Sequence, residues 1–161
     1  MFYALLAVFS AFIVFADQFT KFLTVTHIPQ VGLEIPFWDG VVHFTRYHNT
    51  GMSFSMFEGG RWVFVVMTVL ALTLMILAVI KKWVNHPVGL WALACIFGGA
   101  VGNFIDRLRL GYVIDMIEVE FVNFAVFNVA DSFVVCGAIL LVIYTLFFDR
   151  SEEEKPHDPA G

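Results

Sequence analysis

Four long apolar stretches run through the chain. Each is long enough to cross a bilayer as a helix, which takes roughly 20 mostly apolar residues. They cover residues 1–25, 62–80, 88–106 and 128–148. The first stretch is the least uniform, because Asp17 and Lys21 interrupt it. The pattern predicts an all-α membrane protein in which a single domain, residues 1–161, holds four transmembrane helices.

A different pattern marks the surface loop of residues 27–60, which joins the first two stretches. Apolar residues alternate with Gly, Glu and Pro from Val31 to Phe37, as in a half-buried strand. Asp39-Gly40 then gives a hairpin signal. We therefore expect a small β-sheet that lies on the membrane surface.

Two further segments are not predicted to span. Residues 111–127 are apolar but too short to cross the membrane beside their neighbours, so we expect an interfacial segment that lies at the membrane surface or covers a site. The polar tail, residues 151–161, is expected to be disordered.

The composition supports a membrane protein. The 161 residues are 60% hydrophobic and 14% charged, with a mean hydropathy of +0.83, whereas soluble domains carry about 25% charged residues. Much of the net charge of −5 lies in Ser151–Lys155. No basic face suggests a nucleic-acid partner.

The connectivity brings the polar residues of the spans together. Four spans place both termini on one side of the membrane, and the junctions after the first and third spans on the other side. The polar residues near those two junctions are Asp17, Lys21, Asn103, Asp106, Arg107, Asp115, Asn128 and Asp131. We therefore expect a polar cluster at one face of the membrane, between closely packed helices. The small residues of Gly98–Gly102 allow such packing.

Charge counting leaves the orientation open, because four Lys and Arg residues on the side of the termini face five on the other side. The very short loop Lys81-Lys82-Trp83 favours termini in the cytoplasm, since short loops weigh most in the positive-inside rule. That orientation makes the small sheet extracytoplasmic.

Two carboxylates stand out because they lie at the edges of apolar stretches. A carboxylate at a membrane boundary is costly unless it is paired, hydrated or used. Asp131 has a structural alternative, since Asn128 is able to cap the fourth helix with Asp131 three residues later near the positive end of the helix dipole. Asp115 is flanked by Ile114 and Met116, which makes a solvated loop carboxylate a weaker explanation. Brought together, the two suggest acid–base chemistry on a substrate that also lives in the membrane.

Two other charged pairs are interpreted as structural. Asp17 and Lys21 are four residues apart, on one helical face. Asp106 directly precedes Arg107, and we expect these two to form an ion pair.

Other catalytic motifs are missing from the sequence. The histidines are scattered without a zinc spacing, and neither His-Glu-x-x-His nor Gly-x-Ser-x-Gly occurs. A serine protease with a lysine base stays conceivable, although Lys21 is the only lysine on the predicted polar face. We expect no metal and no cofactor.

Five short motifs, in order along residues 17–132, resemble those of the bacterial lipoprotein signal peptidases, the type II signal peptidases. They are Asp17–Lys21, Asn49–Ser55, Gly98–Arg107, Val113–Ile117 and Phe127–Ser132. The second has Met52 and Ser53 where the family more often has two alanines, and the fourth has Met116 where the family usually has phenylalanine. These departures concern packing more than chemistry.

The resemblance implies an aspartic peptidase of the bacterial inner membrane, with Asp115 and Asp131 as its catalytic pair. Its substrate is a prolipoprotein with a diacylglyceryl group on a cysteine, and it cuts the signal peptide just before that cysteine. The active site of the family faces the periplasm, which implies cytoplasmic termini. We expect the loop from Trp38 to Phe57 to close over the bound peptide.

The resemblance also assigns supporting residues. Substrate-binding positions are Asn49, Gly51, Asn103, Arg107 and Asn128, the last of which helps to hold the catalytic pair. Structural support is expected from Asp17, Lys21 and Asp106. The partners implied are lipid-modified prolipoprotein signal peptides and membrane lipids, and we expect the chain to act as a monomer.

Two alternatives come from other classes of protein. A small transporter or proton channel also places Asp, Asn and Arg inside a helix bundle, but it usually shows repeats or mid-span polar residues. A non-enzymatic membrane scaffold explains the helices but not the five polar motifs.

Overall fold

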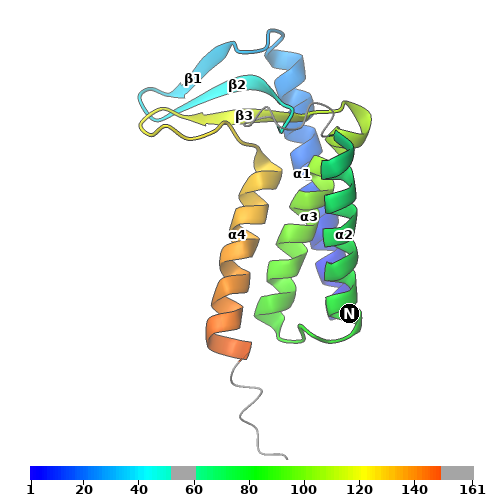
Figure 1. Ribbon diagram of the computed structural model, residues 1–161. Coiled ribbons are helices and arrows are strands. Elements are labelled where there is room, and N and C mark those ends of the chain that lie inside the picture. The colour runs from blue at the N-terminus through cyan, green and yellow to red at the C-terminus, as the bar shows by residue number, and fades with distance from the viewer. Residues whose placement is uncertain (52–60, 150–161) are drawn as a thin grey trace, which may run out of the picture.

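A computed structural model describes residues 1–51 and 61–149 of the chain. Four helices lie alongside one another: α1 (Phe2–His27), α2 (Arg61–Ile80), α3 (Pro87–Arg109) and α4 (Val129–Tyr144), the last continued by a π-helical turn, η1 (Thr145–Asp149) (Figure 1). All four are long and apolar enough to span a membrane. The prediction of four transmembrane helices is therefore confirmed. The end of the loop expected to close over a peptide (52–57) and the tail expected to be disordered (151–161) lie outside the described residues.

Local sequence explains where the last two helices begin. His86 is the N-cap of α3 and its ring nitrogen accepts from the backbone of Val88, while Pro87 occupies the first turn, where its missing N–H costs nothing. Asn128 caps α4, and Asp131 completes a capping box by accepting from the backbone N–H of Asn128. The predicted cap at Asn128 is confirmed.

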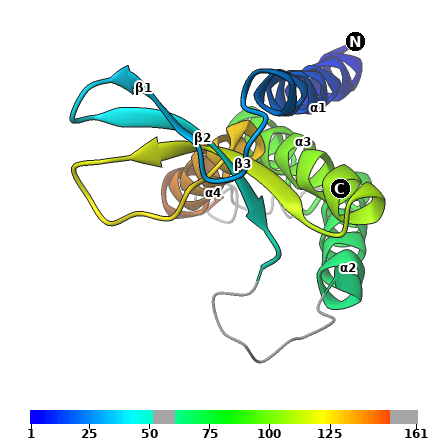
Figure 2. The same cartoon turned by 90° about the horizontal axis from the view of Figure 1, so that it is seen from above.

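The small sheet has three antiparallel strands in the order β1–β2–β3: β1 (Glu34–Trp38), β2 (Val42–Asn49) and β3 (Val113–Val119). It lies across one end of the helices and extends to one side of them (Figures 1 and 2). The predicted hairpin at Asp39-Gly40 is present, and Gly40 has a φ of +73°. The alternation from Val31 correctly indicated a strand, but the strand begins only at Glu34, because Val31 and Gly32 form a turn. The half-buried character was wrong, since every residue of β1 is exposed.

The segment 111–127 supplies the third strand, which the sequence did not predict. Asn49 of β2 pairs with Val113, and Tyr47 pairs with Asp115. The first four residues of β3 are buried. The alternating pattern of the loop 27–60 pointed to a sheet within that loop, whereas the sheet is completed by a strand that follows α3. A location of this segment at the membrane surface stays a prediction.

Helix α3 is the central helix and packs against each of the other three (Figure 2). Close approach depends on small residues, as the run Gly98–Gly102 indicated. A side chain at Gly99 would collide with the backbone of Ala130 in α4, and one at Gly102 would collide with the carboxylate of Asp17 in α1. These contacts bring the polar ends of α1, α3 and α4 together beneath the sheet.

Candidate active site

Polar side chains from five elements meet at the end of the bundle that lies under the sheet. Their sources are α1, α3, the start of α4, and strands β2 and β3. The residues joined there by hydrogen bonds or ion pairs are Asp17, Lys21, Asn49, Asn103, Asp106, Asp115, Asn128 and Asp131. The predicted convergence at one end of the spans is confirmed.

Asp115 is fully buried, with 0% of its surface exposed. Its two carboxylate oxygens accept from different amides: Oδ2 from Asn49 Nδ2 at 2.9 Å and Oδ1 from Asn128 Nδ2 at 2.6 Å. The pKa of Asp115 is raised to about 6, mainly by burial and to a smaller extent by the negative charge of Asp131, while the amides of Asn49 and Asn128 act against the rise. Asp115 therefore holds a proton to a higher pH than an ordinary aspartate.

Asp131 lies in the first turn of α4 and is partly exposed. Oδ1 accepts from Asn103 Nδ2 at 2.7 Å, and Oδ2 accepts from the backbone N–H of Asn128 at 3.1 Å. The N-terminal end of a helix stabilises a negative charge. Asp131 thus serves as a helix cap and also faces the polar cluster, so its structural role does not exclude a chemical one.

Two asparagine side chains connect the carboxylates. Asn128 Nδ2, which donates to Asp115, also lies 3.0 Å from Asn103 Oδ1, and Asn103 Nδ2 donates to Asp131. The carboxylates therefore belong to one hydrogen-bond network and interact through their charges. A pair in which one member holds a proton and the other is ionised is able to perform general acid–base catalysis.

Asn49 is held in position by its own neighbour. The backbone N–H of Gly51 donates to Asn49 Oδ1 at 2.8 Å, which directs the amide nitrogen toward Asp115. Gly51 has a φ of +77°, and a side chain there would meet the ring of Phe64. The rest of the motif, residues 52–55, lies outside the described part of the chain.

Lys21 sits at the centre of a buried ionic cluster. Its Nζ lies 2.9 Å from Asp17 Oδ2, 2.9 Å from Asp106 Oδ2 and 2.9 Å from Asn103 Oδ1. The predicted Asp17–Lys21 pair is confirmed. Through Asn103, the ammonium group also touches the network that holds the two carboxylates.

The predicted Asp106–Arg107 ion pair was wrong. Successive residues of a helix point in different directions, so the two side chains do not share a face. Asp106 pairs with Lys21 and accepts from the backbone N–H of Ile114 at 3.1 Å. The Arg107 guanidinium lies instead over the ring of Phe64, 5.1 Å from its centre. Its charge interacts most strongly with Asp131, then with Asp115, and least with Asp106.

Gln18 also belongs to this buried polar cluster, although the sequence did not indicate it. Its Nε2 donates to Asp106 Oδ1 at 2.9 Å and to the backbone carbonyl of Gly102 at 3.2 Å. Its position beside Asp17 was the available signal, but nothing local indicates a partner on α3. Asp17 also links α1 to α4, because its Oδ1 accepts a hydrogen bond from the backbone N–H of Ala130 at 3.1 Å.

The described residues contain no group of three or more His, Cys, Asp or Glu side chains that is arranged to hold a metal ion.

Known proteins with similar sequences are membrane peptidases. A family model described as "Signal peptidase (SPase) II" matches residues 9–147. A "Lipoprotein signal peptidase" of Streptococcus pyogenes serotype M5 (strain Manfredo) is 48% identical over 131 residues, which cover 79% of this chain and 83% of the relative. The protein of the same name from serotype M3 (strain ATCC BAA-595 / MGAS315) is 47% identical with the same coverage.

Two solved structures share the fold. One, described as a bacterial membrane enzyme determined by the in meso method at 2.3 Å resolution, has a TM-score of 0.83 and 27% identity, and the match covers 98% of this chain and 95% of that one. The other, a bacterial membrane enzyme at 1.9 Å resolution, has a TM-score of 0.85 and 28% identity, with 90% and 94% covered.

Proposed function

The chain belongs to the signal peptidase II family, and we propose that it is an aspartic endopeptidase that removes signal peptides from prolipoproteins. The family is one of membrane aspartic peptidases. The observation that carries the proposal is the network in which Asn103 and Asn128 link a buried carboxylate, Asp115, to a second one at a helix start, Asp131. The transporter and scaffold alternatives lose support, because the matched family consists of peptidases.

Asp115 and Asp131 are the proposed catalytic pair. Two carboxylates with interacting charges do not ionise independently, and they titrate as a pair. Asp115, with a pKa of about 6, is the protonated member, and Asp131, at the helix N-terminus, is the ionised one. A bound peptide would exclude further water and raise the pKa of the buried carboxyl again, which keeps Asp115 protonated nearer neutral pH.

The reaction follows from these two states. Ionised Asp131 takes a proton from a water molecule while the water oxygen attacks the scissile carbonyl carbon, and Asp115 gives its proton to the carbonyl oxygen. As the resulting diol collapses, Asp131 returns its proton to the leaving nitrogen and the C–N bond breaks. Asp115 regains a proton from a diol hydroxyl as the new carbonyl forms. Both side chains end in their starting states.

The remaining site residues have proposed supporting roles. Asn128 and Asn49 hold the two oxygens of Asp115, and Asn103 holds Asp131. Gly51 fixes Asn49. We assign substrate contact to Asn49, Gly51, Asn103 and Arg107. Structural support is assigned to Asp17, Lys21 and Asp106, in which one buried ammonium pairs with two carboxylates.

The proposed substrate is a prolipoprotein with a diacylglyceryl group on its cysteine, cut just before that cysteine. The acyl chains would lie along apolar helix surfaces in the bilayer, which holds the peptide at a fixed depth. Most of the roughly 0.8 kcal/mol per CH₂ gained on leaving water is already gained in the membrane, so recognition depends on the polar end of the substrate.

The proposed location is the bacterial inner membrane, with the carboxylates toward the periplasmic or extracytoplasmic side and both termini cytoplasmic. The short Lys81-Lys82 loop at the opposite end of the bundle supports this orientation. We propose that a monomer suffices, since every group assigned to the reaction comes from one chain.

The test is cleavage by the purified protein. A lipidated precursor, incubated with the protein in detergent, should yield a shorter product on a gel, and mass spectrometry should place the new N-terminus at the lipid-bearing cysteine. The absence of cleavage by protein with an intact thermal unfolding transition would contradict the proposal. A cut at another position would contradict the assigned substrate.

A further inference from the structure

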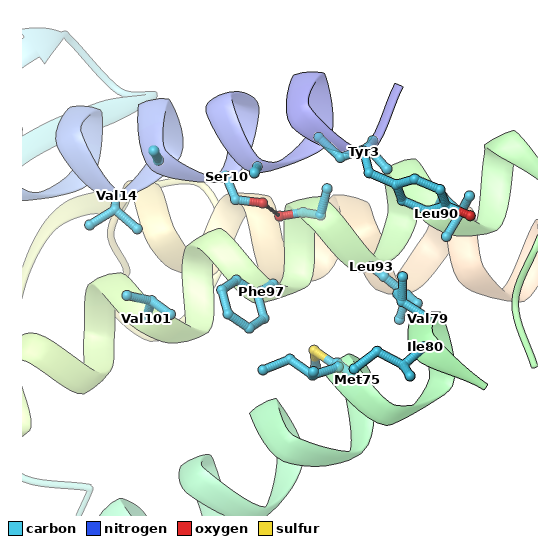
Figure 3. Close-up of a pocket in the computed structure, with 15 residues that line it drawn as sticks. Tyr3, Ser10, Val14, Met75, Val79, Ile80, Leu90, Leu93, Phe97 and Val101 are labelled. Atoms are coloured by element: carbon cyan, nitrogen blue, oxygen red, sulfur yellow. Dashed lines mark hydrogen bonds between the residues drawn. The ribbon is translucent and has the colours of Figure 1, made fainter. Parts of the chain in front are cut away.

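A hollow lies between α1, α2 and α3 (Figure 3). Its volume is about 590 Å³, within the range of about 300–1,000 Å³ seen for small-molecule sites. Helices α1 and α2 each pack on α3, but over their described residues they make at most a marginal contact with each other. The hollow is therefore an apolar groove, floored by α3, which we call the α1–α2–α3 groove.

The depth of this groove in the membrane follows from the residues that line it. On α1 they run from Tyr3 to Val14, which spans about 16 Å at 1.5 Å per residue. That is about half of the roughly 30 Å hydrocarbon core. Since α1 begins at the end of the bundle away from the sheet (Figure 1), the groove lies mainly in the leaflet opposite the carboxylates. Its inner end, at Val14 and Val101, approaches the level of the polar cluster. None of the residues that line the groove belongs to the proposed peptidase site.

The chemistry of the lining selects a hydrocarbon chain. The groove is lined almost entirely by apolar side chains, including Met75, Phe97 and Ala11. The polar group of Ser10 is satisfied, because its hydroxyl donates to the carbonyl of Ala94 at 3.0 Å (Figure 3). Beyond the hydroxyl of Tyr3 at its outer end, the groove offers little to a polar ligand, whereas an acyl chain of the surrounding leaflet fits it.

The mouth of the groove carries positive charge. Ile80, which lines the groove, is the last residue of α2, and the exposed Lys81 and Lys82 follow it directly. No Asp or Glu occurs between Ile80 and Val101. Trp83, 65% exposed, and Tyr3, 55% exposed, lie at the same end, and such aromatic residues mark the headgroup level of a bilayer.

We propose that the α1–α2–α3 groove binds an anionic phospholipid, with one acyl chain in the groove and the phosphate beside Lys81 and Lys82. The acyl chain gains little free energy on moving from the bilayer into the groove, because both environments are apolar. The preference among lipids therefore comes from the headgroup, and each lysine near an anionic headgroup favours it about fivefold. This site lies outside the peptidase reaction.

Native mass spectrometry of the purified protein with equal amounts of dioleoyl phosphatidylglycerol and dioleoyl phosphatidylcholine tests the proposal. We expect bound phosphatidylglycerol to exceed bound phosphatidylcholine by roughly 25-fold, as two lysines at about fivefold each imply. The double variant Lys81→Gln/Lys82→Gln should bring the ratio close to one. Arg109→Gln, an exposed cation at the other end of α3, should leave the ratio unchanged. Equal binding by the natural chain, or an unaltered ratio in the double variant, would overturn the proposal.

Groove-filling variants test the acyl-chain part. Ala11→Phe places a ring in the groove and should reduce total bound lipid several-fold. Val8→Phe adds a ring at a position of α1 that is 66% exposed and does not line the groove, and it should leave binding unchanged. Ala7→Leu fills the groove with a smaller side chain. For each variant, retained cleavage of a lipidated precursor shows that the protein is folded. Undiminished binding in folded Ala11→Phe and Ala7→Leu would overturn the placement of the chain.

Discussion

At one end of the helical bundle, α1, α3 and α4 are joined by buried charges and amides, whereas at the other end α1 and α2 are separated by an apolar groove. In a bilayer, lipid tails are as apolar as leucine, so apolar contact alone selects a helix arrangement only weakly. The polar end fixes its geometry because an unpaired buried charge is costly. Chemistry that requires fixed atoms is therefore placed at the polar end, while the apolar end is able to bind exchangeable lipid.

The largest expected effect comes from the two carboxylates. Asp115→Asn and Asp131→Asn should each lower the cleavage rate on the order of 10³-fold or more, because an amide does not exchange the proton that general acid–base catalysis requires. The assay is a gel shift of a lipidated precursor. Ala11→Phe, at the apolar end, is the matched control and should cleave at the natural rate. Turnover well above background in either asparagine variant would contradict the assignment of Asp115 and Asp131 as the catalytic pair.

The next effect concerns the lipid on the substrate. A precursor without the diacylglyceryl group should be cleaved roughly 10²-fold more slowly, because the anchored cysteine is held at the depth of the carboxylates and the free one is not. Matched precursors at equal density in the same bilayer provide the comparison. The ratio of the two cleavage rates should be the same for Ala11→Phe, because the groove that this variant fills lies mainly in the opposite leaflet. Equal rates for the two precursors would show that neither the lipid nor the depth of the cysteine affects cleavage.

A third prediction concerns stability at the polar end. Lys21→Met removes the one cation between Asp17 and Asp106, and breaking such a buried pair costs about 3–5 kcal/mol. The melting temperature in detergent should fall strongly, and Lys81→Met, at an exposed lysine, should change it little. A melting temperature for Lys21→Met equal to that of the natural chain would show that the cluster is not what holds the helix ends together.

The raised pKa of Asp115 makes a fourth, smaller prediction. The carboxyl has an ordinary pKa of 3.8 when unfolded and about 6 when folded, so between these values the folded state binds more protons. Stability should therefore fall as pH rises from about 4 to about 6. Asp115→Asn lacks this titration, so its melting temperature should change less over the same range. Parallel pH profiles for the natural chain and Asp115→Asn would contradict the raised pKa.

The sequence was informative where a pattern is local. Apolar stretches predicted the four helices, and Asp39-Gly40 predicted the hairpin. The apolar flanks of Asp115 marked it as unusual, and it is fully buried. The cap at Asn128 followed from the residue type and the spacing to Asp131.

The sequence did not predict which residues pair over long distances along the chain. The hydrogen bond from Asn49 to Asp115 joins residues 66 positions apart, and no periodicity in either segment indicates the third strand. The partner of Asp106 was misjudged for the same reason, because Lys21 lies on another helix. The groove was also unpredictable, since it depends on α1 and α2 packing on α3 without packing on each other.

The state of the two carboxylates can be measured directly by infrared titration of the protonated carboxyl band of the purified protein. We expect a band that disappears as pH rises through about 6 in the natural chain and is absent from Asp115→Asn. In Asp131→Asn the band should disappear at a lower pH, because a neighbouring negative charge has been removed. A band that persists in Asp115→Asn, or one that titrates unchanged in Asp131→Asn, would contradict the claim that these two aspartates share the reaction's proton.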